Sequence, residues 1–283
     1  MEVTLKAYAK INLSLDIVGK RADNYHLIDS VMQTVSLFDS IVVSTNESGS
    51  VSVDCNGIDN EDNICYFVAK EFFSTACIND GVNIKINKAI PVSAGMGGGS
   101  TDAAAVLVAL NKIYNNPLSK KQLEEIALKA GADVPFFLNG GTSRATGIGE
   151  KLETIENNLT YALVFVKNGV KQSTKSMYEV LDNRNADNFK PHTAELCKAL
   201  NKNDFEAFCD NIGNDFDALW DNTSLKEELK ELGATVSCLS GSGPTVFAIF
   251  NDINRALIAA ATLRGKYTEV YTAVPVKVSY EFE

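Results

Sequence analysis

The segment PVSAGMGGGSTDAAAVLVAL, residues 91–110, places four glycines within five residues, directly before an alanine-rich apolar run. Glycine loses the most conformational entropy on ordering, so four of them together require a reason. Without β-carbons, successive backbone N–H groups can closely approach an anion, and the start of a following helix adds its positive dipole end. The segment therefore predicts a phosphate-binding loop before a helix from Ser100 to about Tyr114. The alternative is a turn whose glycines only permit tight packing.

The loop differs from two common nucleotide-binding motifs. It lacks the G-x-x-x-x-G-K-[ST] pattern of P-loops, and it does not match G-x-G-x-x-G at the end of a parallel strand–helix unit. Ser100 and Thr101 supply hydroxyl groups at the helix start. Such groups either cap the helix or help to hold a metal ion bound to phosphates.

Composition narrows the class of protein. The chain has 283 residues, of which 45% are hydrophobic and 22% charged, which is typical of a globular protein, and its length favours two domains. The formal net charge of -10 argues against nucleic acid or an anionic membrane as a main partner, because both require a basic surface. A small anionic ligand remains compatible, because a few local donors can overcome a distant field that salt screens.

The six cysteines indicate neither zinc nor a disulfide framework, since no two form a CxxC pair and only two histidines accompany them. The first residues do not show the basic, apolar and small-residue pattern of a signal peptide. No apolar run reaches the length of about 18 residues expected of a membrane span. We therefore expect a cytoplasmic protein, either a monomer or a homodimer.

The hydrophobic pattern predicts strands first and helices after them in the first half of the chain. Period-two alternation indicates an antiparallel, half-exposed sheet, and the spacing of Ser119 and Gln122 predicts a capping box for a helix to Ala130. The predicted strands are 3–8, 13–18, 41–45, 51–55 and 82–86, with a further short strand at 142–145 and a helix after Asp62.

The polar segment at 150–160 interrupts this pattern, so we place a boundary between domains 1–155 and 156–283. The second part reads as a strand (161–166), a helical region (173–232), two strands (235–239 and 245–250), a helix (252–266) and a strand (270–273). This β-α-β-β-α-β order predicts a ferredoxin-like domain and an α+β class overall.

Two polar clusters stand out near the N-terminus. Lys10 and Asn12 interrupt an apolar strand and lie on one face of it by alternation. Tyr25 and His26 occupy a loop between strands, where an aromatic beside a histidine could recognise a ring. A solvated lysine and a structural histidine are the alternatives.

Two later clusters also attract attention. Asp133 stands before Val-Pro-Phe-Phe, where loss of solvation should raise its pKa unless a cation, most naturally a lysine, lies nearby. A turn aspartate is the alternative. Gly241, Ser242 and Gly243 form a small-residue turn between strands, and its meaning depends on whether it faces the first glycine loop.

Taken together, these motifs resemble the GHMP kinases, a family marked by a glycine-rich loop before a helix and by a late G-S-G loop. The resemblance lies in PVSAGMGGGST and SGSGP, and in AYAKINLSLDIVGKRADNYHLIDSVMQTVSLFD and GADVPFFLNGGTSRATGIGE. It covers much of residues 7–150 and is weaker in the second half. Met96 stands where the family usually has leucine, and Thr101 where it has a second serine, but neither change removes a backbone donor.

The resemblance implies a two-domain GHMP kinase fold, with an N-terminal α/β domain like the second domain of ribosomal protein S5 and a ferredoxin-like C-terminal domain. It is strongest to the branch that phosphorylates a cytidine diphosphate derivative of methylerythritol. It implies ATP and Mg²⁺, with Asp133 and Lys10 at catalytic positions. It does not identify the Mg²⁺ ligands, for which the hydroxyl group of Ser100 is our candidate. It places the ATP phosphates along Pro91, Val92, Ser93, Ala94, Gly95, Met96, Gly97, Gly98, Gly99, Ser100 and Thr101.

The same resemblance implies that the acceptor substrate contacts Asn12, Tyr25, His26, Tyr178, Gly241, Ser242 and Gly243, with Tyr178 stacking on cytosine. Phosphoryl transfer to an alcohol mainly requires positioning and charge stabilisation. Asp133 would accept the proton of the 2-hydroxyl group, and Lys10 would offset developing charge. A kinase for homoserine, mevalonate or a sugar, a nucleotide-binding regulator without catalysis, and a purely structural protein are the rival interpretations.

Overall fold

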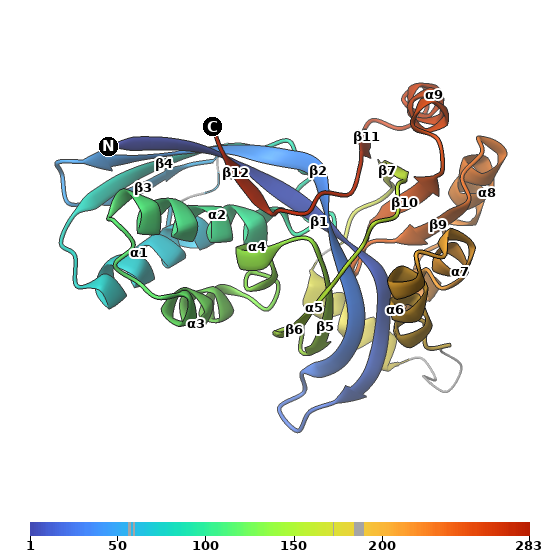
Figure 1. Ribbon diagram of the computed structural model, residues 1–283, viewed down its shortest axis with the longest axis horizontal. Coiled ribbons are helices and arrows are strands. Elements are labelled where there is room, and N and C mark those ends of the chain that lie inside the picture. The colour runs from blue at the N-terminus through green and yellow to red at the C-terminus, as the bar shows by residue number, and fades with distance from the viewer. Residues whose placement is uncertain (56–57, 59, 172, 184–189) are drawn as a thin grey trace.

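The computed structural model describes residues 1–55, 58, 60–171, 173–183 and 190–283. Its first sheet has the order β12-β1-β2-β4-β3, with β5 paired to β2, β6 to β5 and β8 to β1 (Figure 1). The strands are β1 (Glu2–Lys20), β2 (His26–Asn46), β3 (Val51–Asp54), β4 (Gly81–Asn87), β5 (Thr142–Gly147), β6 (Lys151–Ile155), β8 (Gly213–Asn214) and β12 (Tyr280–Phe282).

Four helices lie on one face of this sheet (Figure 1). They are α1 (Ile64–Ala76), α2 (Gly98–Ile113), α3 (Lys120–Ala130) and the short α4 (Phe136–Asn139), and a 3-10 turn, η1 (Asn60–Asp62), precedes α1. The capping box of Ser119 and Gln122 at the start of α3 is confirmed. Helix α1 is capped by Asn63 rather than Asp62, and α2 begins at Gly98 rather than Ser100.

The second sheet is antiparallel throughout and has the order β11-β7-β10-β9. Its strands are β7 (Ala162–Lys167), β9 (Val236–Leu239), β10 (Thr245–Phe250) and β11 (Val270–Ala273), and α9 (Ile253–Leu263) connects the last two. Between β7 and β9 lie α5 (Thr174–Asp182), α6 (Thr193–Lys202), α7 (Phe205–Asp210), the 3-10 turn η3 (Asp215–Leu219) and α8 (Thr223–Glu231). The predicted ferredoxin-like order is confirmed.

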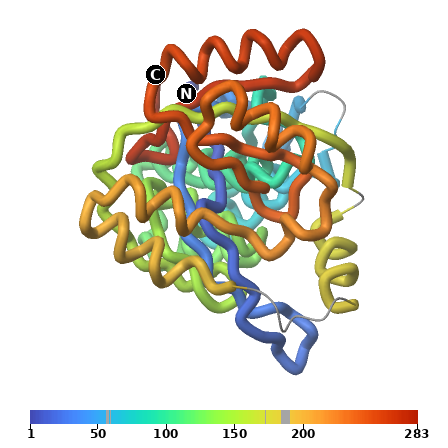
Figure 2. Tube along the Cα trace, turned by 90° about the vertical axis from the view of Figure 1, so that its right-hand side faces the viewer, coloured from blue at the N-terminus to red at the C-terminus, as the bar shows by residue number. Residues whose placement is uncertain are grey.

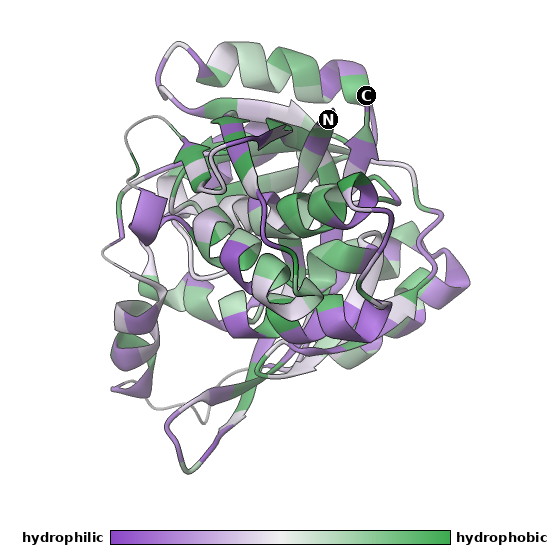
Figure 3. Ribbon diagram, turned by 90° about the vertical axis from the view of Figure 1, so that its left-hand side faces the viewer, coloured by the Kyte–Doolittle hydropathy of each residue, from purple (hydrophilic) through white to green (hydrophobic). Residues whose placement is uncertain are grey.

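Strands β1 and β2 are longer than the sequence pattern predicted. Strand β1 was expected as two strands, 3–8 and 13–18, and only 41–45 of β2 was predicted, yet β1 spans 19 residues and β2 spans 21. Their pairing shifts register near Tyr8, Asn12 and Ile17, and these irregularities break the alternation that marks a strand in the sequence. The hairpin carries its polar tip beyond the body of the molecule, close to α5 (Figures 2 and 3).

Three further strands were not predicted. Strand β6 lies where a break was expected and pairs with the neighbouring β5, β8 lies within the predicted helical region and pairs with β1, and β12 also pairs with β1, with Leu5 opposite Phe282. All three are short, and β8 and β12 depend on pairing with a strand that is distant in the sequence rather than on a local pattern. The domain boundary at residue 155 stays a prediction. None of the described helices is both long and apolar enough to cross a bilayer.

One hydrophobic cluster joins the two sheets. Ala9, Ile11 and Leu13 of β1 pack in it with Leu163 and other residues of the second sheet and its helices. The intervening residues Lys10 and Asn12 point to the other side of the strand, where they are buried among polar groups. The alternation of β1 thus separates an apolar junction from a polar surface.

The glycine loop, residues 91–101, is held against the late turn, residues 240–244, which directly precedes β10. Ser240 Oγ donates a hydrogen bond to Gly95 O at 3.0 Å. Gly95 has a φ of 79°, and a β-carbon on it would lie 2.1 Å from Ser240 O. Gly97 has a φ of 71°, and a β-carbon on it would lie 2.7 Å from the ring of Phe137. Tight packing therefore accounts for two of the four glycines, whereas the β-carbon of Gly99 would meet only Ile64, at 3.7 Å.

Buried charges attach α2 to the sheet. The Lys88 ammonium, directly after β4, bonds to Asp39 of β2 and lies 2.6 Å from Asp102 Oδ2 of α2. Asp39 Oδ1 also accepts hydrogen bonds from the backbone N–H groups of Ala89 and Ile90. One lysine thus faces two buried carboxylates, and burial raises the pKa of Asp102 to about 8.

We predict that Gly95→Ala destabilises the protein whereas Gly99→Ala does not. The first substitution combines an unfavourable φ with a backbone clash, for which we expect a loss of about 2–4 kcal/mol. The second places a helix-favouring residue where its β-carbon would make only an ordinary contact with Ile64, at 3.7 Å, and should lie within about 1 kcal/mol of the wild type. Denaturant unfolding of the pair measures both, and equal stabilities would contradict the packing described for Gly95.

We also predict that the stability difference between wild type and Asp102→Asn depends on pH. The folded protein holds the Asp102 proton to about pH 8, whereas the unfolded chain releases it near 3.8. The contribution of this group is therefore fully present below about pH 4 and is lost as the pH rises to 8. Denaturant titrations at pH 5, 6, 7 and 8 should show the wild type losing stability relative to Asp102→Asn, and a constant difference would contradict this.

Candidate active site

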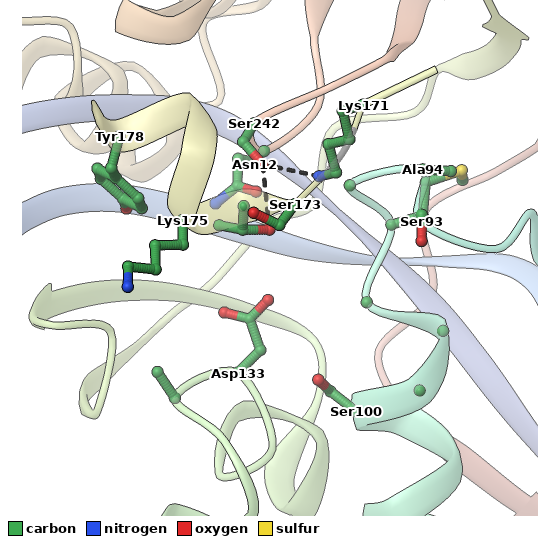
Figure 4. Close-up of a pocket in the computed structure, with 18 of the residues that line it drawn as sticks. Asn12, Ser93, Ala94, Ser100, Asp133, Lys171, Ser173, Lys175, Tyr178 and Ser242 are labelled. Atoms are coloured by element: carbon green, nitrogen blue, oxygen red, sulfur yellow. Dashed lines mark hydrogen bonds between the residues drawn. The ribbon is translucent and has the colours of Figure 1, made fainter. Parts of the chain in front are cut away.

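A cavity of about 1240 Å³ opens where the glycine loop, β1 and the late turn meet (Figure 4). Its lining comes from β1, the loop before α2, the turn between α3 and α4, the connection from β7 to α5, α5 itself and the late turn. These segments are far apart in the sequence. The cavity brings most of the predicted site residues to one place.

Lys10 and Asp133 form the charged centre of the cavity. Lys10 Nζ lies 3.3 Å from Asp133 Oδ2, and the lysine side chain is 5% exposed while that of the aspartate is 35% exposed. Asp133 stands in the turn after α3, and Figure 4 shows its carboxylate pointing into the cavity. The cation expected beside Asp133 is therefore this lysine.

A hydrogen-bond chain fixes the lysine in position. Lys10 Nζ donates to Asn12 Oδ1 at 2.7 Å, and Asn12 Nδ2 donates to Ser30 Oγ at 2.8 Å. Ser30 Oγ in turn donates to the backbone oxygen of Ser14. Because all four residues lie on the β1–β2 hairpin, the ammonium group is aimed by a rigid sheet rather than by a loop.

The glycine loop forms one wall of the cavity. Residues 91–100 all line it, and Figure 4 shows Ser100 at the start of α2 pointing into the cavity. Thr101 differs from the rest of the predicted phosphate-contacting set, because it is buried at 1% exposure and is not among the lining residues. Gly98 and Gly99 begin α2, so their backbone N–H groups belong to the unpaired first turn.

The late turn faces the glycine loop, so the two loops can belong to one binding site. Gly241 and Ser242 line the cavity, and a β-carbon on Gly241 would lie 3.1 Å from Gly95 O. Gly243 points elsewhere, because its β-carbon would lie 2.8 Å from the Trp220 ring. The small residues of this turn thus allow the two loops to meet.

Several aromatic side chains line the far end of the cavity. The rings of His26 and Tyr178 stack with centroids 4.5 Å apart, and Phe216 packs edge-on against Tyr178. His26 Nε2 lies 2.6 Å from Asp182 Oδ1, and Asp182 Oδ2 accepts a hydrogen bond from Lys20. Tyr25 lines the same region with its side chain 60% exposed. The predicted ring-recognising residues therefore lie together.

Sequence reasoning missed several lining residues. Asp182, Lys88 and Lys171 lie in segments with no recognisable motif, and only their position in the fold brings them to the cavity. Lys171 Nζ donates a hydrogen bond to Ser242 Oγ at 2.7 Å (Figure 4). Among the described residues, no group of three or more His, Cys, Asp or Glu side chains is arranged to hold a metal ion.

Comparison with known families gives two matches along the chain. Residues 63–141 match the model of the GHMP kinases N terminal domain, and residues 221–268 match that of the GHMP kinases C terminal domain. A solved structure of 4-(cytidine 5'-diphospho)-2C-methyl-D-erythritol kinase superposes with a TM-score of 0.82 at 28% identity, covering 97% of this chain and 99% of that one. A homoserine kinase from Cytophaga hutchinsonii shares the fold, with a TM-score of 0.80 at 17% identity.

Relatives similar over nearly the whole chain narrow the family further. A 4-diphosphocytidyl-2-C-methyl-D-erythritol kinase from Clostridium beijerinckii is 40% identical, with 94% of this chain and 98% of the relative covered. One from Clostridium perfringens is 42% identical, with 94% and 96% covered. The expected two-domain fold and kinase class are thereby confirmed. The chain belongs to the 4-diphosphocytidyl-2-C-methyl-D-erythritol kinase family, a branch of the GHMP kinases.

Proposed function

We propose that this protein transfers the γ-phosphoryl group of ATP to the 2-hydroxyl group of 4-diphosphocytidyl-2-C-methyl-D-erythritol. The products are the 2-phosphate and ADP, a step of the methylerythritol phosphate route to isoprenoid precursors. The observation that carries the proposal is the Lys10–Asp133 pair, 3.3 Å apart, in a cavity bounded by the glycine loop and an aromatic group. Relatives at about 40% identity over 94% of the chain support the choice of substrate.

Asp133 is the proposed general base. Its carboxylate is one-third exposed and points into the cavity, so it can reach a bound alcohol, and the Lys10 ammonium lies 3.3 Å from it. It accepts the proton of the 2-hydroxyl group as that oxygen attacks the γ-phosphorus. The O–P bond to ADP breaks in the same displacement.

Lys10 is the proposed charge-stabilising residue. Its ammonium group is nearly fully buried, so its field on a neighbouring oxygen is weakly screened by water. Asn12, itself bonded to Ser30, holds the ammonium without adding charge, and Asp133 is its carboxylate partner at 3.3 Å. The ammonium therefore lies beside the proposed base, where the nucleophilic oxygen and the transferring phosphoryl group would meet it.

The glycine loop is the proposed cradle for the ATP phosphates. Gly98 and Gly99 offer unpaired N–H groups at the first turn of α2, and no β-carbon at Gly99 blocks an approaching phosphate. A Mg²⁺ ion bound to ATP needs few protein ligands, and the Ser100 hydroxyl group is placed to be one of them. Such an ion would offset negative charge on the phosphate oxygens.

The aromatic end of the cavity is the proposed site of the cytosine ring. Tyr25, His26 and Tyr178 together offer apolar ring faces and polar ring atoms. Homoserine and mevalonate contain no ring, so this end of the cavity favours the cytidylyl compound over those alcohols.

A panel of acceptors tests the proposed substrate. With ATP, we expect turnover with 4-diphosphocytidyl-2-C-methyl-D-erythritol and kcat/KM values at least about a hundredfold lower with homoserine and mevalonate, because they leave the aromatic end empty. ADP release measures each reaction. Faster turnover of homoserine or mevalonate would contradict the substrate assignment, and no ADP release with any acceptor would favour a regulator without catalysis.

Asp133→Asn tests the proposed base. The amide keeps the shape of the side chain but cannot accept the proton, so kcat should fall by about 10²–10⁴-fold while ATP binding survives. Asp210→Asn, at an exposed position on α7, is the matched control and should keep the wild-type rate. If Asp133→Asn retained more than about a tenth of that rate, Asp133 would not be the base.

A further inference from the structure

Lys171 lines the cavity in addition to the Lys10–Asp133 pair, the glycine loop and the aromatic side chains. It follows β7 and precedes α5, and it lines the cavity beside the late turn. Its ammonium group donates a hydrogen bond to Ser242 Oγ at 2.7 Å, and Ser242 Oγ in turn donates to Thr174 Oγ1 at 3.3 Å. Figure 4 shows the Lys171 side chain on the side of the cavity away from Asp133, with its ammonium group directed toward Ser242.

Among the described residues, the other buried lysines of the cavity have carboxylate partners within 4 Å, and Lys171 does not. Lys10 lies 3.3 Å from Asp133, and Lys88 lies between Asp39 and Asp102. In the part of the chain that the structure describes, no carboxylate lies within 4 Å of Lys171 Nζ. A half-buried ammonium group whose nearest partner is a neutral hydroxyl lacks its counter-charge.

Burial and the charges that face Lys171 explain its lowered pKa. Burial, with the nearby charge of Lys10 adding to it, lowers the pKa of Lys171 to about 8, and only Asp133 acts in the opposite direction. Asp133 is already paired with Lys10. Lys171 therefore holds its proton weakly until another anion enters the cavity.

We propose that Lys171 binds a phosphoryl group of the substrates, which supplies the missing counter-charge. This rests on the proposed kinase function, which gives the cavity two phosphate-bearing ligands: the triphosphate of ATP and the diphosphate of the acceptor. Ser242 is the positioning residue, since its hydroxyl group holds the ammonium at the cavity wall. Lys171 lies outside both segments matched by the family models, 63–141 and 221–268.

Steady-state kinetics of Lys171→Met, Lys171→Arg and the control Lys202→Met test the proposal. Lys202 is exposed at the end of α6, away from the cavity. Lys171→Met should change KM or kcat by about ten- to a hundredfold, Lys171→Arg should restore most of the loss, and Lys202→Met should match the wild type.

The kinetic parameter that changes in Lys171→Met identifies which phosphate Lys171 binds. A raised KM for ATP assigns Lys171 to the triphosphate, and a raised KM for the acceptor assigns it to the diphosphate. A lower kcat with both KM values unchanged assigns it to the group in transfer. Wild-type values of all three parameters in Lys171→Met would overturn the proposal.

Proton uptake gives a second readout that a merely structural lysine would not change. At pH 8, calorimetric titration with a non-hydrolysable ATP analogue and with cytidine diphosphate, in two buffers of different ionisation enthalpy, counts the protons taken up. A group with a pKa of about 8 is half-protonated there, so wild type should take up as much as about half a proton more than Lys171→Arg with one of the ligands.

This measurement separates the two proposals, because it requires no turnover. Absence of acceptor phosphorylation by the wild type would defeat the proposed function and leave the proton count to decide the role of Lys171. Equal proton uptake by wild type and Lys171→Arg with both ligands would overturn that role. If Lys171→Met failed to fold, Lys171→Arg alone would supply the decisive comparison.

Discussion

The alternation of side chains along β1 is the constraint on which the rest of the structure depends. Ala9, Ile11 and Leu13 face the cluster that joins the two sheets, while Lys10 and Asn12 face the polar side. A shift of one residue in register would bury the lysine in the apolar junction and remove the ammonium group from the cavity. The same strand therefore holds the two parts of the molecule together and aims the central cation.

The glycine loop shows that structural and functional explanations of a motif need not compete. Gly95 and Gly97 permit contacts with Ser240 and Phe137 that no larger residue would allow. Gly98 and Gly99 instead begin a helix at the cavity wall, with backbone N–H groups available to a ligand. Met96 is buried in the cluster that joins the sheets, so its unbranched side chain serves packing while its neighbours face the cavity.

Lysines gather at the cavity although the chain as a whole is acidic. The formal net charge is -10, and the cavity is lined by Lys10, Lys20, Lys88, Lys171 and Lys175 together with six carboxylates, those of Asp23, Asp62, Asp102, Asp133, Glu179 and Asp182. Three of the lysines are paired with carboxylates, and Lys171 is bonded to a hydroxyl group. Because salt screens the distant acidic surface more strongly than these close contacts, an acidic protein can still bind an anionic substrate here.

The sequence alone determined the features that depend on local interactions. The glycine loop, the capping box at Ser119 and the shared face of Lys10 and Asn12 follow from backbone and side-chain chemistry within a few residues. The family motifs added the expectation that Asp133 and Lys10 act together. Only the tertiary structure decided which distant segments meet: β12 on β1, Ser240 on Gly95, His26 on Tyr178, and Lys171 on Ser242. These contacts depend on how two sheets pack and how two strands bend, and no short stretch of sequence records that geometry.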